Sequence, residues 1–194
     1  MMDIRLYTQM LEIDSTSGRE RVLADFLAEN LLTGRNRVER FDVRTMAGDL
    51  PEGCALPQNL LFSWGTPKVF FCSHLDTVPP YIPPTVYNAS SDNPSEVEEY
   101  ITGRGTCDAK GQIFAMWEAC KALEAKGYTD FGLLLLAGEE TGSFGAKAFN
   151  DMMPDDSSNL WVIVGEPTDN CMATAAKGTK SFEVSFKGKA FHSG

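Results

Sequence analysis

The chain has 194 residues, of which 43% are hydrophobic and 23% charged, and this composition excludes a disordered tail, a collagen-like fibre and a coiled coil. The net charge of −10 disfavours nucleic acid and anionic membranes as partners, because both are bound through basic surfaces. Five cysteines without a Cys-x-x-Cys pair argue against a disulfide framework and against a cysteine zinc cluster.

Two helices are predicted at the beginning of the chain. Apolar residues recur at helical spacing over residues 3–12 and again over 22–31. Between these segments, Ser17 and Glu20 have the spacing of a capping box, in which each side chain binds a backbone N–H group of the first turn. The sequence therefore predicts that this pair caps the second helix.

Strands are predicted further along the chain, in short apolar runs at residues 59–64, 68–73, 131–137 and 160–164. The last two runs do not alternate with polar residues, so we expect both to be covered by helices on both faces. Helical spacing over 111–127 and 143–152 makes strands and helices alternate. The sequence predicts an α/β domain over residues 1–176, with a largely parallel central sheet flanked by helices.

Two segments depart from this regular pattern. Residues 79–100 are rich in proline and acidic residues, which predicts a solvated surface insertion. From residue 177 the pattern changes again, and alternation over 181–186 predicts a half-buried strand. Because the chain then stops without a closing element, we expect residues 177–194 to begin a second, truncated domain.

Polar side chains follow the predicted strands and turns, in the order His74, Asp76, Asp108, Glu139, Glu140 and Glu166. In open α/β sheets, ligands collect at the carboxyl ends of the strands. So many carboxylates would not stay charged and close together without a cation. One imidazole with several carboxylates suits Zn²⁺ and tolerates Mn²⁺ or Co²⁺. The sequence therefore predicts a divalent metal site.

Each of these residues has a plainer interpretation when it is taken alone. Asp108 could be only a helix N-cap, Glu139 with Glu140 could be a helix N-terminus, and Glu166 could belong to an ordinary turn. Their common place at the ends of strands favours a joint site. A nucleophile based on Cys72 or Cys107 stays open, although a buried structural thiol is the simpler state for both.

Four segments, 73–79, 103–111, 138–142 and 165–168, resemble in order and spacing the M20 family of di-zinc peptidases and N-acyl-amino-acid deacylases. The resemblance implies a zinc-exopeptidase-like catalytic domain followed by an α+β lid and dimerisation domain. It implies that His74, Asp108 and Glu166 bind one zinc ion, and that Asp108, as a bridge, and Glu140 bind a second. It also implies a cis peptide bond after Asp108.

The resemblance further implies catalytic roles for three residues. Asp76 would hydrogen-bond the far nitrogen of His74 and fix its tautomer, as carboxylates behind metal ligands do. Glu139 would be the general base that activates water and passes the proton to the leaving amine. His192, at the start of the lid domain, would polarise the scissile carbonyl, commonly across a homodimer interface.

Hydrolysis of an amide bond in a small carboxylate-bearing substrate is the activity that the family implies. Segments 165–168 and 176–178 look most like the branch of acetylornithine deacetylase and succinyl-diaminopimelate desuccinylase, so we expect an N-acyl-amino-acid deacylase of amino-acid biosynthesis, as in arginine biosynthesis. The alternatives are a di- or tripeptidase or carboxypeptidase of the family, and a non-catalytic metal-binding or assembly fragment.

Length and location complete the expectations. Family members are longer than this chain, which has no third histidine for the second zinc ion, so we expect the chain alone to be nearly inactive. The N-terminus lacks a signal peptide, and no apolar run is long enough to span a bilayer. We therefore expect a cytoplasmic protein with no membrane or nucleic-acid partner.

Overall fold

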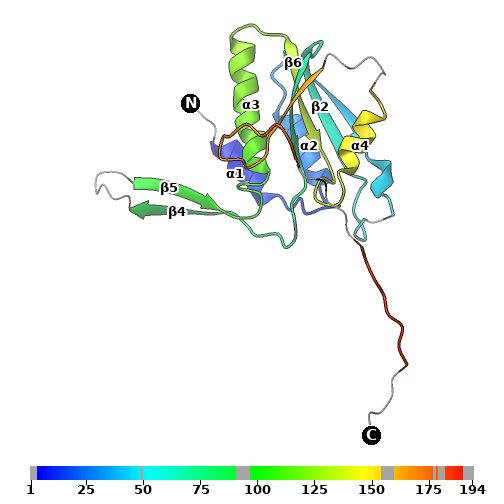
Figure 1. Cartoon of the computed structure of the whole chain (residues 1–194). Coiled ribbons are helices and arrows are strands. Elements are labelled where there is room, and N and C mark those ends of the chain that lie inside the picture. The colour runs from blue at the N-terminus through cyan, green and yellow to red at the C-terminus, as the bar shows by residue number, and fades with distance from the viewer. Residues whose placement is uncertain are drawn as a thin grey trace.

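A five-stranded sheet forms the centre of the chain, with helices on both faces (Figure 1). The computed structural model describes residues 4–48, 50–90, 97–153, 160–176, 178 and 182–189. Its helices are α1 (Ile4–Glu12), α2 (Arg21–Asn30), the short 3-10 helix η1 (Arg44–Met46), α3 (Lys110–Ala125) and α4 (Phe144–Asn150). Its strands are β1 (Arg37–Asp42), β2 (Gln58–Gly65), β3 (Val69–His74), β4 (Thr85–Ser90), β5 (Val97–Thr102), β6 (Asp130–Leu136) and β7 (Trp161–Val164).

The sheet has the strand order β1-β2-β6-β3-β7. Strands β6, β3 and β7 run parallel, while β1 and β2 are added in antiparallel orientation on the side of β6. The predicted α/β class and its parallel centre are confirmed. Because parallel strands end at the same edge, the residues after β3, β6 and β7 meet there.

Alternating side chains of the sheet divide the core between the two helical layers. Leu60, Phe62 and Trp64 of β2 are fully buried on the face covered by α2 and α3, together with Leu133 of β6. On the opposite face, Leu134 of β6 packs in the cluster that contains Phe149 of α4. Each such side chain stabilises the fold by about 1.5–3 kcal/mol relative to exposure to water. The predicted covering of residues 131–137 on both faces is therefore confirmed.

Strand β7 does not have the predicted covering on both faces. Its four apolar residues, Trp161 to Val164, are between 49% and 73% exposed. The strand pairs with β3 on one side only and lies at the edge of the sheet, and among the described residues nothing packs over most of it. The apolar run predicted the strand correctly, but the prediction that helices cover both faces of this strand is wrong.

The predicted capping box at the start of α2 is also wrong. Glu20 occupies the N-cap position, but no side chain caps the helix there. Instead, the Ser17 hydroxyl donates to Asp76, and the Glu20 carboxyl accepts the backbone N–H of Gly138. Both side chains bind partners that are distant in sequence. These partners, the Asp76 carboxylate and the Gly138 N–H, are buried, and buried polar groups need hydrogen bonds more than a helix end that water can reach.

The segments outside the body differ from it in form. Within the predicted surface insertion, β4 and β5 pair as an antiparallel hairpin that projects from the body (Figure 1). The predicted strand at 181–186 is not found: residues 182–189 are extended chain without a ladder partner among the described residues. A half-buried strand needs such a partner. His192 and half of the residues from 177 to 194 lie outside the described part of the chain. No described helix is long and apolar enough to cross a membrane.

Helix α4 begins in close contact with the end of β6, which gives a test of this packing. A Cβ atom on Gly145 would lie 2.4 Å from the carbonyl oxygen of Ala137 and 2.5 Å from Oδ1 of Asn59. Alanine is a better helix former than glycine by about 1 kcal/mol. We nevertheless expect Gly145→Ala to lower the free energy of unfolding by about 1–3 kcal/mol, because the backbone has to move to admit the methyl group.

The measurement is urea denaturation of Gly145→Ala beside the matched variant Gly48→Ala, whose new Cβ would have nothing within 4 Å. The Gly48 variant should unfold close to the midpoint of the unsubstituted chain. If Gly145→Ala were as stable as the unsubstituted chain, α4 would not be docked as described.

Candidate metal centre

His74 is the central side chain at the carboxyl edge of the sheet. It is the last residue of β3 and only 2% exposed. Its Nε2 atom lies 2.9 Å from Oδ1 of Asp108 and 3.9 Å from Oε1 of Glu166, the second residue after β7. Donor atoms of His74, Asp108 and Glu140 all lie within 4.8 Å of one another. Residues from four distant segments therefore converge on one point.

Asp108 follows a turn and leads into helix α3, as the sequence predicts, but the strand before the turn lies outside the central sheet. This strand, β5, pairs only with β4 of the hairpin. Asp108 lies directly before α3, and the peptide bond to Ala109 is cis, as the resemblance implies. The buried side chain of Lys110 fixes the start of α3, since its Nζ atom donates to the carbonyl oxygen of Ile13 at 2.6 Å.

Asp76 lies beneath the cluster and is completely buried. Its Oδ1 atom accepts the N–H of Glu139 at 2.9 Å, and its Oδ2 atom accepts the N–H of Glu140 at 3.1 Å and the hydroxyl of Ser17 at 2.9 Å. Nδ1 of His74 lies 2.9 Å from the carbonyl oxygen of Asp76 and 3.6 Å from its carboxylate. The resemblance implied a hydrogen bond between His74 and the carboxylate of Asp76, whereas the contact within hydrogen-bond distance is to the backbone oxygen. No sequence pattern indicated the hydrogen bonds from the two glutamates to this carboxylate.

The turn between β6 and α4 is held by side chains at four consecutive N–H groups. The N–H of Ala137 donates to Asn59, that of Gly138 to Glu20, and those of Glu139 and Glu140 to Asp76. All three acceptor side chains are fully buried. Sequence reasoning missed Asn59 entirely and assigned Glu20 to the wrong partner. The spacing of Ser17 and Glu20 was the available signal, and only the fold shows what these residues bind.

The electrostatics of the cluster favour a positive charge. Burial lowers the pKa of His74, but the carboxylates of Asp76, Glu166 and Asp108 outweigh this effect and raise it to about 9. Burial and the negative charge of Asp108 raise the pKa of Glu140 and of Glu166 above the usual value. Burial also raises the pKa of Asp76, but the neighbouring imidazole of His74 and the hydrogen bond from Glu139 bring it below its usual value.

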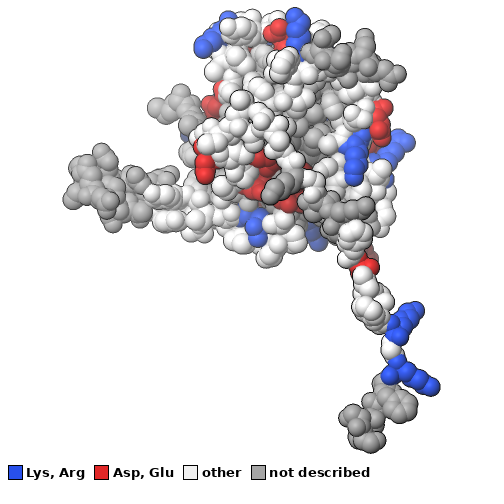
Figure 2. All heavy atoms as spheres, in the orientation of Figure 1, with Lys and Arg blue, Asp and Glu red and all other residues white. Residues whose placement is uncertain are grey.

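These residues fit a divalent cation. A histidine nitrogen and carboxylate oxygens from separate segments are the mixed ligand set that zinc and similar ions accept. A cation would satisfy the same carboxylates that the protonated imidazole satisfies in its absence, and Figure 2 shows acidic atoms gathered near the middle of the body. Asp108 and Glu166 are 48% and 38% exposed in their side chains, so an ion in solution has access to them.

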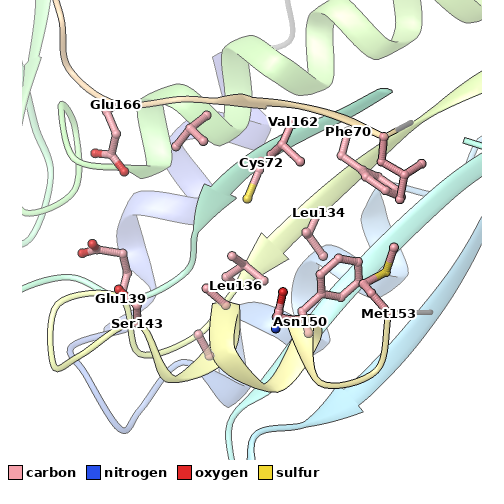
Figure 3. A pocket seen from close by; sticks show the side chains of 15 residues that line it. Phe70, Cys72, Leu134, Leu136, Glu139, Ser143, Asn150, Met153, Val162 and Glu166 are labelled. Atoms are coloured by element: carbon pink, nitrogen blue, oxygen red, sulfur yellow. The ribbon is translucent and has the colours of Figure 1, made fainter. Parts of the chain in front are cut away.

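An apolar groove of about 440 Å³ begins beside the cluster. It lies between helix α4 and the face of β3, β6 and β7 that is turned toward this helix, and its side chains include Phe70, Leu134 and Phe149. Glu139 and Glu166 stand at one end with their carboxylates turned toward the same space, and Met153 stands at the other end (Figure 3). Glu139 thus lines the groove, while its neighbour Glu140 belongs to the donor cluster.

A layered α/β fold that carries a histidine and carboxylate cluster at the carboxyl edge of parallel strands fits a metal-dependent enzyme, and hydrolases are one class of such enzymes. A comparison with protein families makes this class specific. The profile described as "Peptidase family M20/M25/M40" matches residues 70–191. The chain therefore belongs to the peptidase family M20/M25/M40.

Curated relatives are named as carboxypeptidases. A probable carboxypeptidase of Aspergillus fumigatus is 34% identical over 201 residues, which are 98% of this chain and 46% of that protein. A probable carboxypeptidase of Aspergillus terreus is 35% identical over 199 residues, 98% of this chain and 44% of that protein. The chain thus spans about half the length of the curated relatives that it matches.

Solved structures agree on the fold. The aminopeptidase PepT from Bacillus cereus has a TM-score of 0.52 and 27% sequence identity, over 75% of this chain and 38% of that one. A tripeptidase from Staphylococcus aureus has a TM-score of 0.58 and 24% identity, over 78% of this chain and 40% of that one. The second likeness, at lower identity, supports the fold alone.

The raised pKa of His74 predicts how metal affinity depends on pH. Below about pH 9 the imidazole of the metal-free chain carries a proton that has to leave before a metal ion binds the nitrogen. Raising the pH removes this competitor, so we expect the affinity for Zn²⁺ to rise about tenfold per pH unit between pH 6 and 8.

The measurement is competition with a colorimetric chelator at pH 6, 7 and 8, corrected for the protonation of the chelator itself. The exposed carboxylate variant Glu52→Gln should give the same slope, because Glu52 lies outside the cluster. An affinity that stays constant over this range would contradict a role for His74 as a ligand.

Proposed function

We propose that this chain carries the catalytic centre of a metal-dependent peptidase that removes residues from the carboxyl end of small peptides. The family membership supports hydrolysis of a peptide bond, and the names of the curated relatives support a carboxypeptidase. The chain spans about half the length of those relatives, so the proposal concerns the activity of the whole protein rather than of this segment alone.

The different surroundings of two adjacent glutamates are the observation that carries the proposal. Glu140 lies in the donor cluster with His74 and Asp108, whereas Glu139 lines the groove. A purely structural metal site has no use for a second carboxylate held beside the ligands. Asp76 fixes the backbone of both residues by one N–H each, so one is directed to the ion and the other to the substrate side.

Zinc is the ion that we propose for this centre, with Co²⁺ and Mn²⁺ as possible substitutes. His74, Asp108, Glu140 and Glu166 would hold up to two such ions. When bound, such ions supply Lewis-acid polarisation of the scissile carbonyl and lower the pKa of water. The role of the ligands is to bring these charges to one edge of the sheet in a fixed arrangement.

Glu139 acts as the general base in this proposal. Its carboxylate accepts a proton from the attacking water and returns it to the amine that leaves. Asp76 keeps Glu139 in place through its backbone and stays ionised, because its pKa lies below the usual value. Polarisation of the carbonyl by His192 and formation of a homodimer stay predictions, since residue 192 lies outside the described part of the chain.

The expected acetylornithine-like deacylase is less well supported than the peptidase alternative. The relatives reported above are named carboxypeptidases, and the solved structure at 27% identity is named an aminopeptidase. A deacylase and a peptidase of this family break the same type of bond, so four metal-site segments do not separate them. Substrate comparison is therefore the decisive test.

The test uses the protein from the complete reading frame that encodes this chain, loaded with Zn²⁺. Its substrates are an N-blocked dipeptide with a free carboxylate, the C-terminal amide of the same dipeptide, and acetylornithine. We expect zinc-dependent hydrolysis of the free-carboxylate peptide to exceed that of both other compounds. Faster hydrolysis of acetylornithine would return the assignment to a deacylase.

Substitution of Glu139 tests the mechanism in the same protein. We expect Glu139→Gln to lower kcat by about 10²–10⁴, because a general base contributes this much, while the zinc content stays unchanged. Glu52→Gln, an exposed carboxylate outside the centre, serves as the control and should keep the full kcat. Full activity of Glu139→Gln would exclude Glu139 as the base.

A further inference from the structure

We infer that Glu20 is a positioning residue of this centre, which holds the turn of Glu139 and Glu140 through the backbone of Gly138. Its effect on catalysis rests on the proposed function, whereas its effect on the turn does not. Nothing in the family match or in the names of the relatives assigns a role to this residue. Glu20 lies 119 positions before Glu139 in the sequence, so only the fold brings them together.

The side chain of Glu20 binds the turn after β6 and not helix α2, which Glu20 precedes. Glu20 is the N-cap residue of α2, but its carboxyl makes no capping hydrogen bond to that helix. It is fully buried, and its Oε1 atom accepts the N–H of Gly138 at 3.2 Å. Burying a carboxyl group is costly unless the group is hydrogen-bonded. The hydrogen bond that Glu20 makes is to the turn after β6 rather than to the helix.

Gly138 is the residue at which the chain turns from β6 toward the two glutamates. Its φ angle is +68°, and a Cβ atom there would lie 2.6 Å from the sulfur of Met46. The positive φ angle and the closeness of Met46 therefore restrict the backbone conformation of this turn. The N–H of Gly138 is buried. Without an acceptor this group would destabilise the turn, so the turn would rearrange until the N–H reached another acceptor.

Glu20 and Asp76 together hold three successive N–H groups. Gly138 donates to Glu20, and Glu139 and Glu140 donate to Asp76. Because these groups are consecutive, release of the first changes the direction in which the next two residues enter the centre. The position of Glu140 beside His74 and that of Glu139 at the groove (Figure 3) both depend on this direction.

The contribution of Glu20 comes from its acceptor oxygen rather than from its charge. Its second oxygen, Oε2, has no hydrogen-bond partner among the described residues. Burial raises the pKa of Glu20 to about 7, and the nearby charge of Asp76 adds to the rise. The backbone N–H groups of Glu20, Gly18 and Gly138 lower this pKa but do not outweigh burial. Glutamine keeps an acceptor oxygen at the same length of side chain. Glu20→Gln should therefore preserve the turn, and Glu20→Ala should release it.

The experiment compares Glu20→Ala, Glu20→Gln and Leu23→Ala in the 194-residue chain. Leu23 is a fully buried residue of α2, so its truncation destabilises the same helix without touching the turn. The first readout is hydrogen exchange of the amides at 138–140 in the metal-free chain. The second is titration with Co²⁺, followed by visible absorption, which reports affinity and ligand geometry.

We expect Glu20→Ala to speed exchange of these amides and to weaken Co²⁺ affinity by about 10–100-fold, the usual effect of removing a group behind metal ligands. Glu20→Gln should stay near the unsubstituted chain in both readouts. Leu23→Ala should lower the thermal midpoint yet keep the visible spectrum, which separates positioning from general loss of stability.

Two results would overturn the inference: unchanged exchange at 138–140 in Glu20→Ala, or equal defects in Glu20→Gln and Glu20→Ala. If the unsubstituted chain took up no Co²⁺, the proposed metal centre would fail. In that case the exchange readout alone would still decide whether Glu20 holds the turn, so the two failures are distinguishable.

Discussion

The Asp76 carboxylate is fully buried and accepts hydrogen bonds from Glu139, Glu140 and Ser17. These three donors belong to segments before α2 and after β6, while Asp76 itself follows β3. One buried charge therefore ties three parts of the chain together. A buried carboxylate without such partners would destabilise the fold, so docking of these segments and formation of the centre are one event. The fold of the chain, rather than a bound ion, consequently holds the proposed metal-binding residues in place.

The division of the sheet explains why this edge carries the chemistry. Strands β6, β3 and β7 run parallel, and the polar residues that follow them lie at one edge of the sheet. Strand β2 runs antiparallel to β6 and contributes buried core residues, while β1 pairs with β2 at the far edge. The cluster then has more acidic groups than one imidazole can neutralise. The raised pKa of His74 is the response of the metal-free chain to this excess. The same excess gives a divalent cation its affinity.

Sequence patterns predicted what depends on neighbouring residues and failed where distant partners decide. The runs that became β2, β3, β6 and β7 were found, and so were the polar residues after them, because both are local features. Strand β1 was missed, since most of its side chains are exposed and charged. The exposure of β7, the hairpin before Asp108 and the use of Ser17 and Glu20 all depend on tertiary neighbours. No local pattern reports such neighbours.

The open edge of β7 also determines where the sheet can be extended. One side of this strand pairs with β3, and its other side offers backbone N–H and C=O groups beside apolar side chains, with none of the described strands paired to it. An uncharged edge of this kind is a template onto which a strand of another molecule adds. Among the described residues, β7 is therefore an edge at which the sheet has room for a further strand, on the side of the sheet that also borders the groove.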